Sequence, residues 1–249
     1  MSAIEDRKHV NNAYFDTLAN DWYDAWDSPV ALLRQESLAK LAWAIPLLTQ
    51  KAVSTVLDVG CGAGLVSNVL ASHGFRVTGV DFSKDALAVA CAHAPRDNPP
   101  DYQWGDAYAL PFADRAFDAV VAFDFLEHVT SPKGIISEVK RVLRPGGVFL
   151  FHTFNRNPLS HIVVIKALEW FVKNTPPKLH TIDLFIRPSE LRRMLRDAGF
   201  AKPEFHGLRP VINRALFDLL RTGVVSPAFQ FTETSSTLVS YCGSCVASP

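Results

Sequence analysis

Short apolar runs alternate with segments of helical spacing through the middle of the chain. The run "STVLDVG" at 54–60 is typical of a buried parallel strand. The segment "LVSNVLASHG" that follows has helical spacing and stops at Gly74, a residue type favoured just past a helix end. The pattern then predicts strands over 76–83, 117–125 and 148–154, a short strand followed by a loop over 101–109, and helices over 84–94 and 131–147. This order predicts an α/β fold of the Rossmann-like, doubly wound kind, with a mostly parallel sheet.

The flanking regions are expected to complete a single domain over 1–249. Another helix is expected at "SELRRMLRDAGF", and extended pieces near 202–209 and 236–246 are expected to finish the sheet as an edge hairpin. The expected parts are an N-terminal helical cap at 1–50, a ligand-binding core at 51–153, a hydrophobic insertion or lid at 154–186, and a C-terminal helix with closing strands at 187–249.

The insertion contains a strongly apolar segment, "TFNRNPLSHIVVIKALEWFVKN". Its apolar part, 159–172, is too short to span a bilayer, which takes about 20 residues. Lys166, Glu169 and Lys173 form one polar stripe, and apolar residues cover most of the remaining circumference of a helix that prolines confine on both sides. Two interpretations remain open: a lid over the active site, or an interfacial helix in peripheral contact with a membrane.

Composition and charge exclude some classes of protein. The 25 basic residues balance the 25 acidic ones, which argues against a protein that binds nucleic acid by neutralising phosphates. The start of the chain is polar and shows no signal peptide, so a cytoplasmic protein is expected. Cys242 and Cys245 form a lone "CGSC" pair, half a zinc site at most, and are interpreted as ordinary strand or loop cysteines.

The first chemical motif is "VLDVGCGAG", at the turn between the first strand and the first helix. Gly60, Gly62 and Gly64 let the backbone approach a ligand closely, and Cys61 lies between them. Asp58 distinguishes this turn from a dinucleotide site, where a carboxylate would repel a pyrophosphate. A carboxylate at this position suits a cationic ligand, such as the amino group of a methionine moiety.

The ends of the next two strands supply residues suited to a nucleoside. Asp81 lies about 20 residues after the glycines, where a carboxylate can accept hydrogen bonds from both ribose hydroxyls. Phe82 can lie on an adenine face, and Asp106, followed by Ala107, can accept a hydrogen bond from the adenine amino group. These positions define a candidate nucleoside site.

With "LDVGCGAG", "GVDFS", "GDAYALPFADRAFDAVV" and "VLRPGG" in order, residues 54–150 resemble a class I S-adenosylmethionine (SAM)-dependent methyltransferase. The resemblance implies an enzyme that uses SAM and releases S-adenosylhomocysteine, with a seven-stranded sheet and an antiparallel edge strand. The alternatives are a dehydrogenase-type domain, an inert α/β fold and a DNA amino-methyltransferase. The sequence "NPPD" at 98–101 precedes the third strand, however, whereas the similar motif of DNA methyltransferases follows the fourth.

The fourth strand runs into "AFDFLEHVTSP", which is expected to reach the acceptor. Phe123 is placed next to SAM, and Asp124, Glu127 and His128 near the acceptor. A phenol with a pKa near 10 is only about 0.1 % ionised at pH 7, so a base could contribute up to about 4 kcal/mol. His128 is the best candidate base and Glu127 a second catalytic candidate. A structural turn, or a divalent cation held by Asp124, Glu127 and His128, remains an alternative.

The flanks resemble the ubiquinone-biosynthesis O-methyltransferases. The matching motifs are "YFDTLANDWYD", "FDFLEHV", Thr153 to Asn157 after the fifth strand, Pro177 to Thr181 around His180, and "FIRPSEL" at 185–191. The resemblance implies a hydrophobic phenolic or quinol acceptor, an enzyme at the cytosolic face of a membrane, and SAM contacts at Gly60, Asp81, Phe123 and Lys40. Asp124 replaces the family's usual glutamate, and the segment after 208 is longer than the family's.

Two other functions remain open. One is methylation of a soluble small molecule on oxygen, nitrogen or a carboxylate, with the insertion as a lid. The other is a SAM-binding accessory protein without catalysis.

Overall fold

The computed structural model describes residues 12–248. Residues 1–11, the first part of the expected N-terminal cap, and Pro249 lie outside the described residues.

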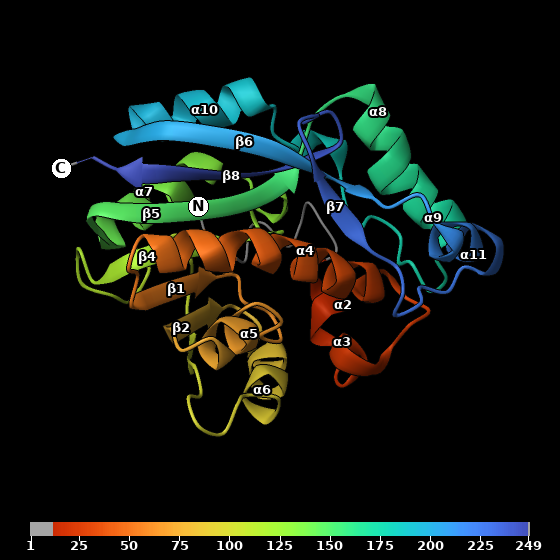
Figure 1. Ribbon diagram of the computed structural model, residues 1–249, viewed down its shortest axis with the longest axis horizontal. Coiled ribbons are helices and arrows are strands. Elements are labelled where there is room, and N and C mark those ends of the chain that lie inside the picture. Colours follow the sequence, from red (N-terminus) through yellow and green to blue (C-terminus); the bar gives the residue numbers. More distant parts are fainter. Residues whose placement is uncertain (1–11, 249) are drawn as a thin grey trace.

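An eight-stranded sheet forms the centre of the molecule, in the order β3-β2-β1-β4-β5-β8-β6-β7 (Figure 1). Its strands are β1 (Thr55–Val59), β2 (Arg76–Asp81), β3 (Asp101–Trp104), β4 (Phe117–Ala122), β5 (Leu143–Phe154), β6 (Phe200–Pro210), β7 (Phe231–Thr234) and β8 (Ser240–Ala247). The first five strands pair in parallel, whereas β8 lies antiparallel between β5 and β6. The mostly parallel Rossmann-like sheet is therefore confirmed, with one strand more than expected, because β7 adds an antiparallel edge to β6.

The longer helices follow the predicted order. They are α4 (Pro29–Gln50), α5 (Ser67–Ser72), α6 (Lys84–Ala92), α7 (Pro132–Val142), α10 (Pro188–Asp197) and α11 (Arg214–Thr222). The short ones are α2 (Ala13–Asp16), α3 (Asp21–Asp24), η1 (Leu126–His128), α8 (Pro158–Ser160), η2 (His161–Lys166), α9 (Ala167–Phe171) and η3 (Ile182–Leu184). Helix α7 ends five residues earlier than predicted, because Leu143 already pairs with Phe117 as the start of β5.

Helices cover both faces of the sheet. Successive side chains of a strand point to opposite faces, so Leu57 packs with α7 and α10 while Val56 packs with α4 and α5. A strand buried on both faces needs apolar residues at every position. Asp58, the fourth of the five residues of β1, is the exception that calls for a function.

Strand β8 carries the "CGSC" sequence, and its cysteines are free, buried thiols. Gly243 faces the ring of Phe151, and a Cβ at this glycine would lie 2.5 Å from that ring and 2.5 Å from the carbonyl oxygen of Glu204. The glycine of this motif is therefore required for the close packing of β8 against Phe151 and the backbone of Glu204.

Replacing Gly243 by alanine is expected to lower the free energy of unfolding by about 1–3 kcal/mol, because the added methyl overpacks the sheet. Chemical denaturation measures the change. Ser244→Ala, the next residue on the same strand, is the matched control and should cost about 1 kcal/mol or less. Equal loss in both variants would contradict this packing role.

The apolar insertion forms one helical segment, 158–171, from α8, the π-helical turn η2 and α9. It lies beside α11 at the end of the sheet where β5 finishes (Figure 1). Lys173 donates its backbone N–H to the carbonyl of Gly223 (3.1 Å), and Val225 donates to the carbonyl of Trp26 (2.7 Å). The insertion, the C-terminal segment and the N-terminal helices therefore form one connected wall. No helix within residues 12–248 is long and apolar enough to cross a membrane.

Candidate active site

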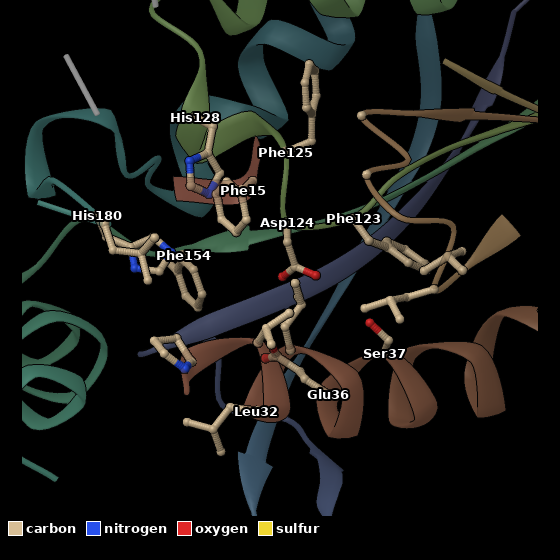
Figure 2. A pocket seen from close by; sticks show the side chains of 18 of the residues that line it. Phe15, Leu32, Glu36, Ser37, Phe123, Asp124, Phe125, His128, Phe154 and His180 are labelled. Carbon is tan, nitrogen blue, oxygen red and sulfur yellow. The ribbon is translucent and has the colours of Figure 1, made fainter. Parts of the chain in front are cut away.

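A cavity of about 470 Å³ opens at the carboxyl ends of the parallel strands, where ligands bind in open α/β sheets. The glycine turn after β1 and the ends of β2 and β4 form one part of it, and the insertion and α11 form the other. Figure 2 shows the middle of this cavity. One continuous space therefore joins the predicted nucleoside site to an apolar region.

The glycine turn needs its glycines for close approach as well as for conformation. Gly60 has a φ of +73°, and a Cβ there would lie 2.2 Å from the ring of Phe125. Gly64 has a φ of +78°, and its Cβ would lie 2.3 Å from the hydroxyl of Tyr102. Gly60 and Gly62 line the cavity, whereas Gly64 is required for the packing behind it.

Two carboxyl groups lie at this end of the cavity, Asp58 buried and Asp81 half-buried. Asp58 accepts a hydrogen bond from the Ser67 hydroxyl (2.6 Å), and burial raises the pKa of Asp58 to about 7. Asp81 accepts backbone N–H bonds from Gly62 (2.8 Å) and Ser83 (2.8 Å), and burial raises its pKa as well. These acceptors, fixed close to the glycine turn, suit a ligand that carries hydroxyls and a positive charge.

The remaining predicted cofactor residues of this region also line the cavity: Cys61, Phe82, Asp106, Ala107 and Phe123. The ring of Phe82 lies 5.3 Å from that of Trp104, and Asp106 accepts the backbone N–H of Tyr108 (3.0 Å). The sequence motifs thus converge on one site.

His128, the predicted base, lies at the junction between the two parts of the cavity. Its Nδ1 is 2.9 Å from Oδ1 of Asn12, and the Asn12 amide also points toward the carbonyl of His128 (3.4 Å). With Nδ1–H donated to Asn12, the lone pair is left on Nε2. Burial lowers the pKa of His128 to about 4 although Asp124 opposes the shift, so the imidazole is unprotonated at neutral pH.

A second histidine, His180, lies beside the first (Figure 2). The two ring centroids are 5.4 Å apart, and Phe15 packs edge-on against His128 at 5.6 Å. Burial, together with the charge of His128, lowers the pKa of His180 to about 3. Within the described residues, Nδ1 of His180 has no hydrogen-bond partner.

Two other predicted site residues are placed differently. Glu127 is fully buried and is not one of the described residues that line the cavity; burial and the charge of Asp124 raise its pKa to about 8. Lys40 is also fully buried away from the cavity surface, and its ammonium pairs with Glu36 (3.3 Å) and Asp124. The expected contacts of Lys40 with SAM and of Glu127 with the acceptor stay predictions.

The metal-capable group is not the predicted one. Within the described residues, ligand atoms of Glu36, Asp124 and His152 lie within 4.8 Å of one another. The ammonium of Lys40 pairs with both carboxylates of this group and already supplies a positive charge. Lys40 therefore neutralises one of the two carboxylate charges of this group.

Sequence reasoning missed several residues of the site. Glu36 and Phe15 come from the N-terminal helices, and nothing in their local pattern marks them as cavity residues. His152 could have been found, because it is a polar residue in the middle of the apolar run of β5. A buried polar side chain in a central strand requires a polar partner.

The outer part of the cavity is apolar. Its lining includes Val163, Val164, Leu168 and Phe171 of the insertion, Leu216, Leu219 and Leu220 of α11, and Phe229 and Phe231. Val163, Leu220 and Phe171 line the cavity while remaining 41 %, 43 % and 39 % exposed. The cavity therefore opens to solvent through an apolar rim.

Comparison with known proteins identifies the class. Residues 57–151 match the methyltransferase domain family. Two solved structures share the fold along nearly the whole chain. Magnesium protoporphyrin IX methyltransferase from Synechocystis with bound S-adenosylhomocysteine has a TM-score of 0.65 at 20 % identity and covers 99 % of both chains. A possible histamine N-methyltransferase from Thermotoga maritima has a TM-score of 0.61 at 19 % identity and covers 98 % of this chain and 99 % of that one. The chain is a SAM-dependent methyltransferase.

Sequence relatives narrow the class further. A Pseudomonas putida protein named ubiquinone biosynthesis O-methyltransferase is 36 % identical over 205 residues, which cover 82 % of this chain and 87 % of that protein. An Acinetobacter baumannii protein of the same name is 32 % identical over 207 residues, covering 81 % and 87 %. The chain belongs to the ubiquinone biosynthesis O-methyltransferase family.

Proposed function

We propose that this enzyme transfers a methyl group from SAM to a hydroxyl of a hydrophobic aromatic acceptor. The observation that carries the proposal is the position of His128: a buried, unprotonated imidazole where the polar and apolar parts of one cavity meet. A phenolic hydroxyl needs a base at this place, whereas a neutral amine already carries its nucleophilic lone pair.

The glycine-turn end of the cavity is assigned to the methyl donor. Asp81 accepts hydrogen bonds from the ribose hydroxyls, Phe82 and Ala107 contact the adenine, and Asp106 accepts from its amino group. Asp58 lies near the cationic methionine end, and Gly60, Cys61, Gly62 and Phe123 shape the surface between them. SAM supplies a methyl group on a sulfonium, whose thioether leaves without needing an acid.

The chain's own residues therefore orient the reactants and remove one proton. Nε2 of His128 takes the hydroxyl proton while the oxygen–carbon bond forms and the carbon–sulfur bond breaks. Asn12 holds Nδ1, so that Nε2 is the ring nitrogen left to accept the proton. Burial of His128 among aromatic rings keeps it neutral before the reaction.

The acceptor class is supported by the apolar part of the cavity and by the names of the relatives. A prenylated catechol or hydroquinone has a polar ring and an apolar tail, and the cavity has a polar junction and an apolar exit. The rim of that exit continues into exposed apolar residues of the insertion, above all Trp170 (66 % exposed) and Ile162 (51 %). We infer that residues 159–172 both cover the cavity and contact the surface of a membrane that holds the acceptor.

The pH dependence follows from the lowered pKa of His128. The active form is the unprotonated imidazole. At saturating SAM, kcat/KM for the acceptor should therefore stay constant as the pH falls from 8 to about 5 and decline only as the pH approaches 4. A pH–rate profile with a soluble acceptor, paired with circular dichroism to detect unfolding, measures this. A decline centred near pH 6.5 with intact structure would contradict the assignment.

Ile162→Ser combined with Trp170→Ser should weaken binding to liposomes at least fivefold, because both side chains are exposed and neither lines the cavity. Activity on a short-tailed soluble acceptor should not change. Leu38→Ser, an exposed leucine on α4, is the matched control. Unchanged liposome binding together with a loss of soluble activity would favour a lid that never meets a membrane.

Mass spectrometry of quinone-pathway intermediates in cells that lack the protein tests the proposed function. Accumulation of a demethylated phenol or quinol, reversed by the wild-type gene and not by a His128→Ala variant, is the expected result. An unchanged set of quinone intermediates would refute the proposed acceptor class.

A further inference from the structure

One segment before α4, residues 12–26, contacts both halves of the active site. It comprises α2, α3 and the residues beside them, and we call it the strap. Its first residues contact His128, whereas α3 contacts the glycine turn after β1. The strap therefore connects the part of the cavity assigned to the methyl donor with the proposed base.

The donor-side end of the strap packs directly on the glycine turn. The indole ring of Trp22 is buried and lines the cavity, and a Cβ added at Gly62 would lie 3.1 Å from that ring. Tyr23 donates its hydroxyl to the carbonyl oxygen of Ala63 (2.9 Å). A ligand that binds on this turn therefore adjoins the side chain of Trp22 as well.

The other end of the strap holds His128. Oδ1 of Asn12 is 2.9 Å from Nδ1 of the imidazole, and the Asn12 amide is 3.4 Å from the carbonyl oxygen of His128. Phe15 packs edge-on against the imidazole, with 5.6 Å between the ring centroids, and Figure 2 shows the two side chains next to each other. A displacement of α2 would therefore change both contacts that orient the base.

The two ends are joined by packing within the strap. The ring of Phe15 stacks on that of Trp22, 5.5 Å away, and the indole N–H of Trp22 donates to the carbonyl oxygen of Phe15 (3.3 Å). These rings belong to a small apolar cluster with Leu18, Ala63 and Ala86, separate from the two clusters that flank the sheet. The strap can therefore shift as a unit without disturbing the core of the sheet.

Arg34 of α4 anchors the strap, and it is not one of the described residues that line the cavity. Its guanidinium donates to the carbonyl oxygens of Asp21 (3.3 Å), Trp22 (3.1 Å) and Ala25. It also lies over the ring of Trp26, 4.5 Å from the ring centroid. A guanidinium presents its donors in one rigid plane, which a lysine ammonium cannot reproduce.

We propose that the strap, with Arg34 as its positioning residue, couples the methyl-donor site to the base. A donor bound on the glycine turn packs against Trp22 and holds the strap in place, and the strap in turn orients His128. The acceptor then binds more tightly, because the base no longer has to be ordered when it arrives. By linkage, the acceptor tightens donor binding by the same factor. This inference rests on the proposed function and adds to it a coupling between the two sites.

Calorimetry tests the coupling with S-adenosylhomocysteine and 3-hexylcatechol, a pair that cannot react. Saturating S-adenosylhomocysteine should lower the Kd of the catechol at least about fivefold in the wild type and less than about twofold in Arg34→Gln. Arg34→Lys should give an intermediate ratio of the two Kd values. Arg193→Gln, an exposed arginine on α10, is the matched control and should keep the wild-type ratio. A merely structural role of Arg34 would weaken both Kd values and leave their ratio unchanged.

Hydrogen exchange tests the coupling without an acceptor. In the wild type, S-adenosylhomocysteine should slow amide exchange in the strap and also in residues 126–130, the loop that carries His128. In Arg34→Gln the protection of this loop should be lost while that of the glycine turn remains. Tyr23→Phe, which removes only the hydroxyl that bonds to Ala63 and Asn68, should act in the same direction. It decides the question if Arg34→Gln fails to fold.

The outcomes separate this inference from the proposed function. Methyl transfer to the catechol with the same Kd ratio in the wild type and in Arg34→Gln would overturn the coupling and leave O-methylation intact. A wild-type enzyme that neither binds nor methylates the catechol would instead refute the proposed acceptor. In that case, loop protection that is lost in Arg34→Gln would still support the strap, and equal protection in both enzymes would overturn it.

Discussion

Replacing His128 by alanine is expected to lower kcat at least a hundredfold and to leave the affinity for SAM unchanged. The reason is that Nε2 of His128 is the group assigned to the hydroxyl proton, and general-base catalysis typically contributes about 10²–10⁴-fold. Single-turnover transfer from labelled SAM measures the chemical step, and calorimetry measures the affinity. An acceptor that is already ionised, such as a nitrocatechol, should recover a large part of the lost rate.

The control for this variant is His73→Ala, an exposed histidine in the turn after α5, which should retain wild-type kcat. An unchanged kcat in His128→Ala would contradict the assignment of His128 as the general base and would leave it a structural role in the loop after β4. Loss of SAM affinity together with kcat would also contradict it, because the imidazole would then be part of the donor site.

Asp81→Asn is expected to weaken SAM binding by about 10- to 100-fold, since an amide cannot replace a carboxylate that accepts hydrogen bonds on both oxygens. In the structure the carboxylate already receives the backbone N–H groups of Gly62 and Ser83, so the substitution also loosens the glycine turn. Calorimetric titration with SAM measures the change in Kd.

Asp85→Asn, in the exposed first turn of α6, is the matched control and should bind SAM like the wild type. At saturating SAM, Asp81→Asn should retain kcat within about tenfold, because the contact proposed for Asp81 is with the ribose and not with the transferred methyl group. A wild-type Kd for SAM in Asp81→Asn would contradict the proposed contact of Asp81 with the ribose.

The core of the fold could be predicted because each of its elements carries its own signal. The spacing of apolar residues differs between strand β1, which contains Asp58, and the helix α5 that follows it. Gly74, with a φ of +89°, comes just after the end of that helix. The site residues at strand ends followed from the same reasoning, since parallel strands bring their carboxyl ends together. Ten of the predicted site residues therefore line one cavity: Asp58, Gly60, Cys61, Gly62, Asp81, Phe82, Asp106, Ala107, Phe123 and His128.

The C-terminal additions were missed although local signals were present. Helix α11 has Asn213 as its N-cap, with Oδ1 accepting from the backbone of Leu216 (3.2 Å), and Gly223 in the left-handed conformation at its end. Strand β7 could not be predicted in the same way. It has four residues of weak pattern and owes its existence to pairing with β6.

The acceptor side depends on contacts far apart in sequence. Lys40 reaches Asp124 across 84 residues, and Asn12 reaches His128 across 116. No periodicity or spacing encodes such pairs. Of these residues, only His152 could be recognised from its local sequence, as a polar residue in a strand that is buried on both faces.

The central claim is methyl transfer to a phenolic oxygen of a hydrophobic acceptor. The most direct test incubates the purified enzyme with SAM carrying a deuterated methyl group and with 3-hexylcatechol, 2-hexylaniline or hexanoic acid, and identifies the products by mass spectrometry. We predict a single deuterated methyl ether on the catechol, abolished in His128→Ala, with no methylated aniline and no methyl ester. Methylation of the aniline or of the carboxylic acid with an unreacted catechol would contradict the account.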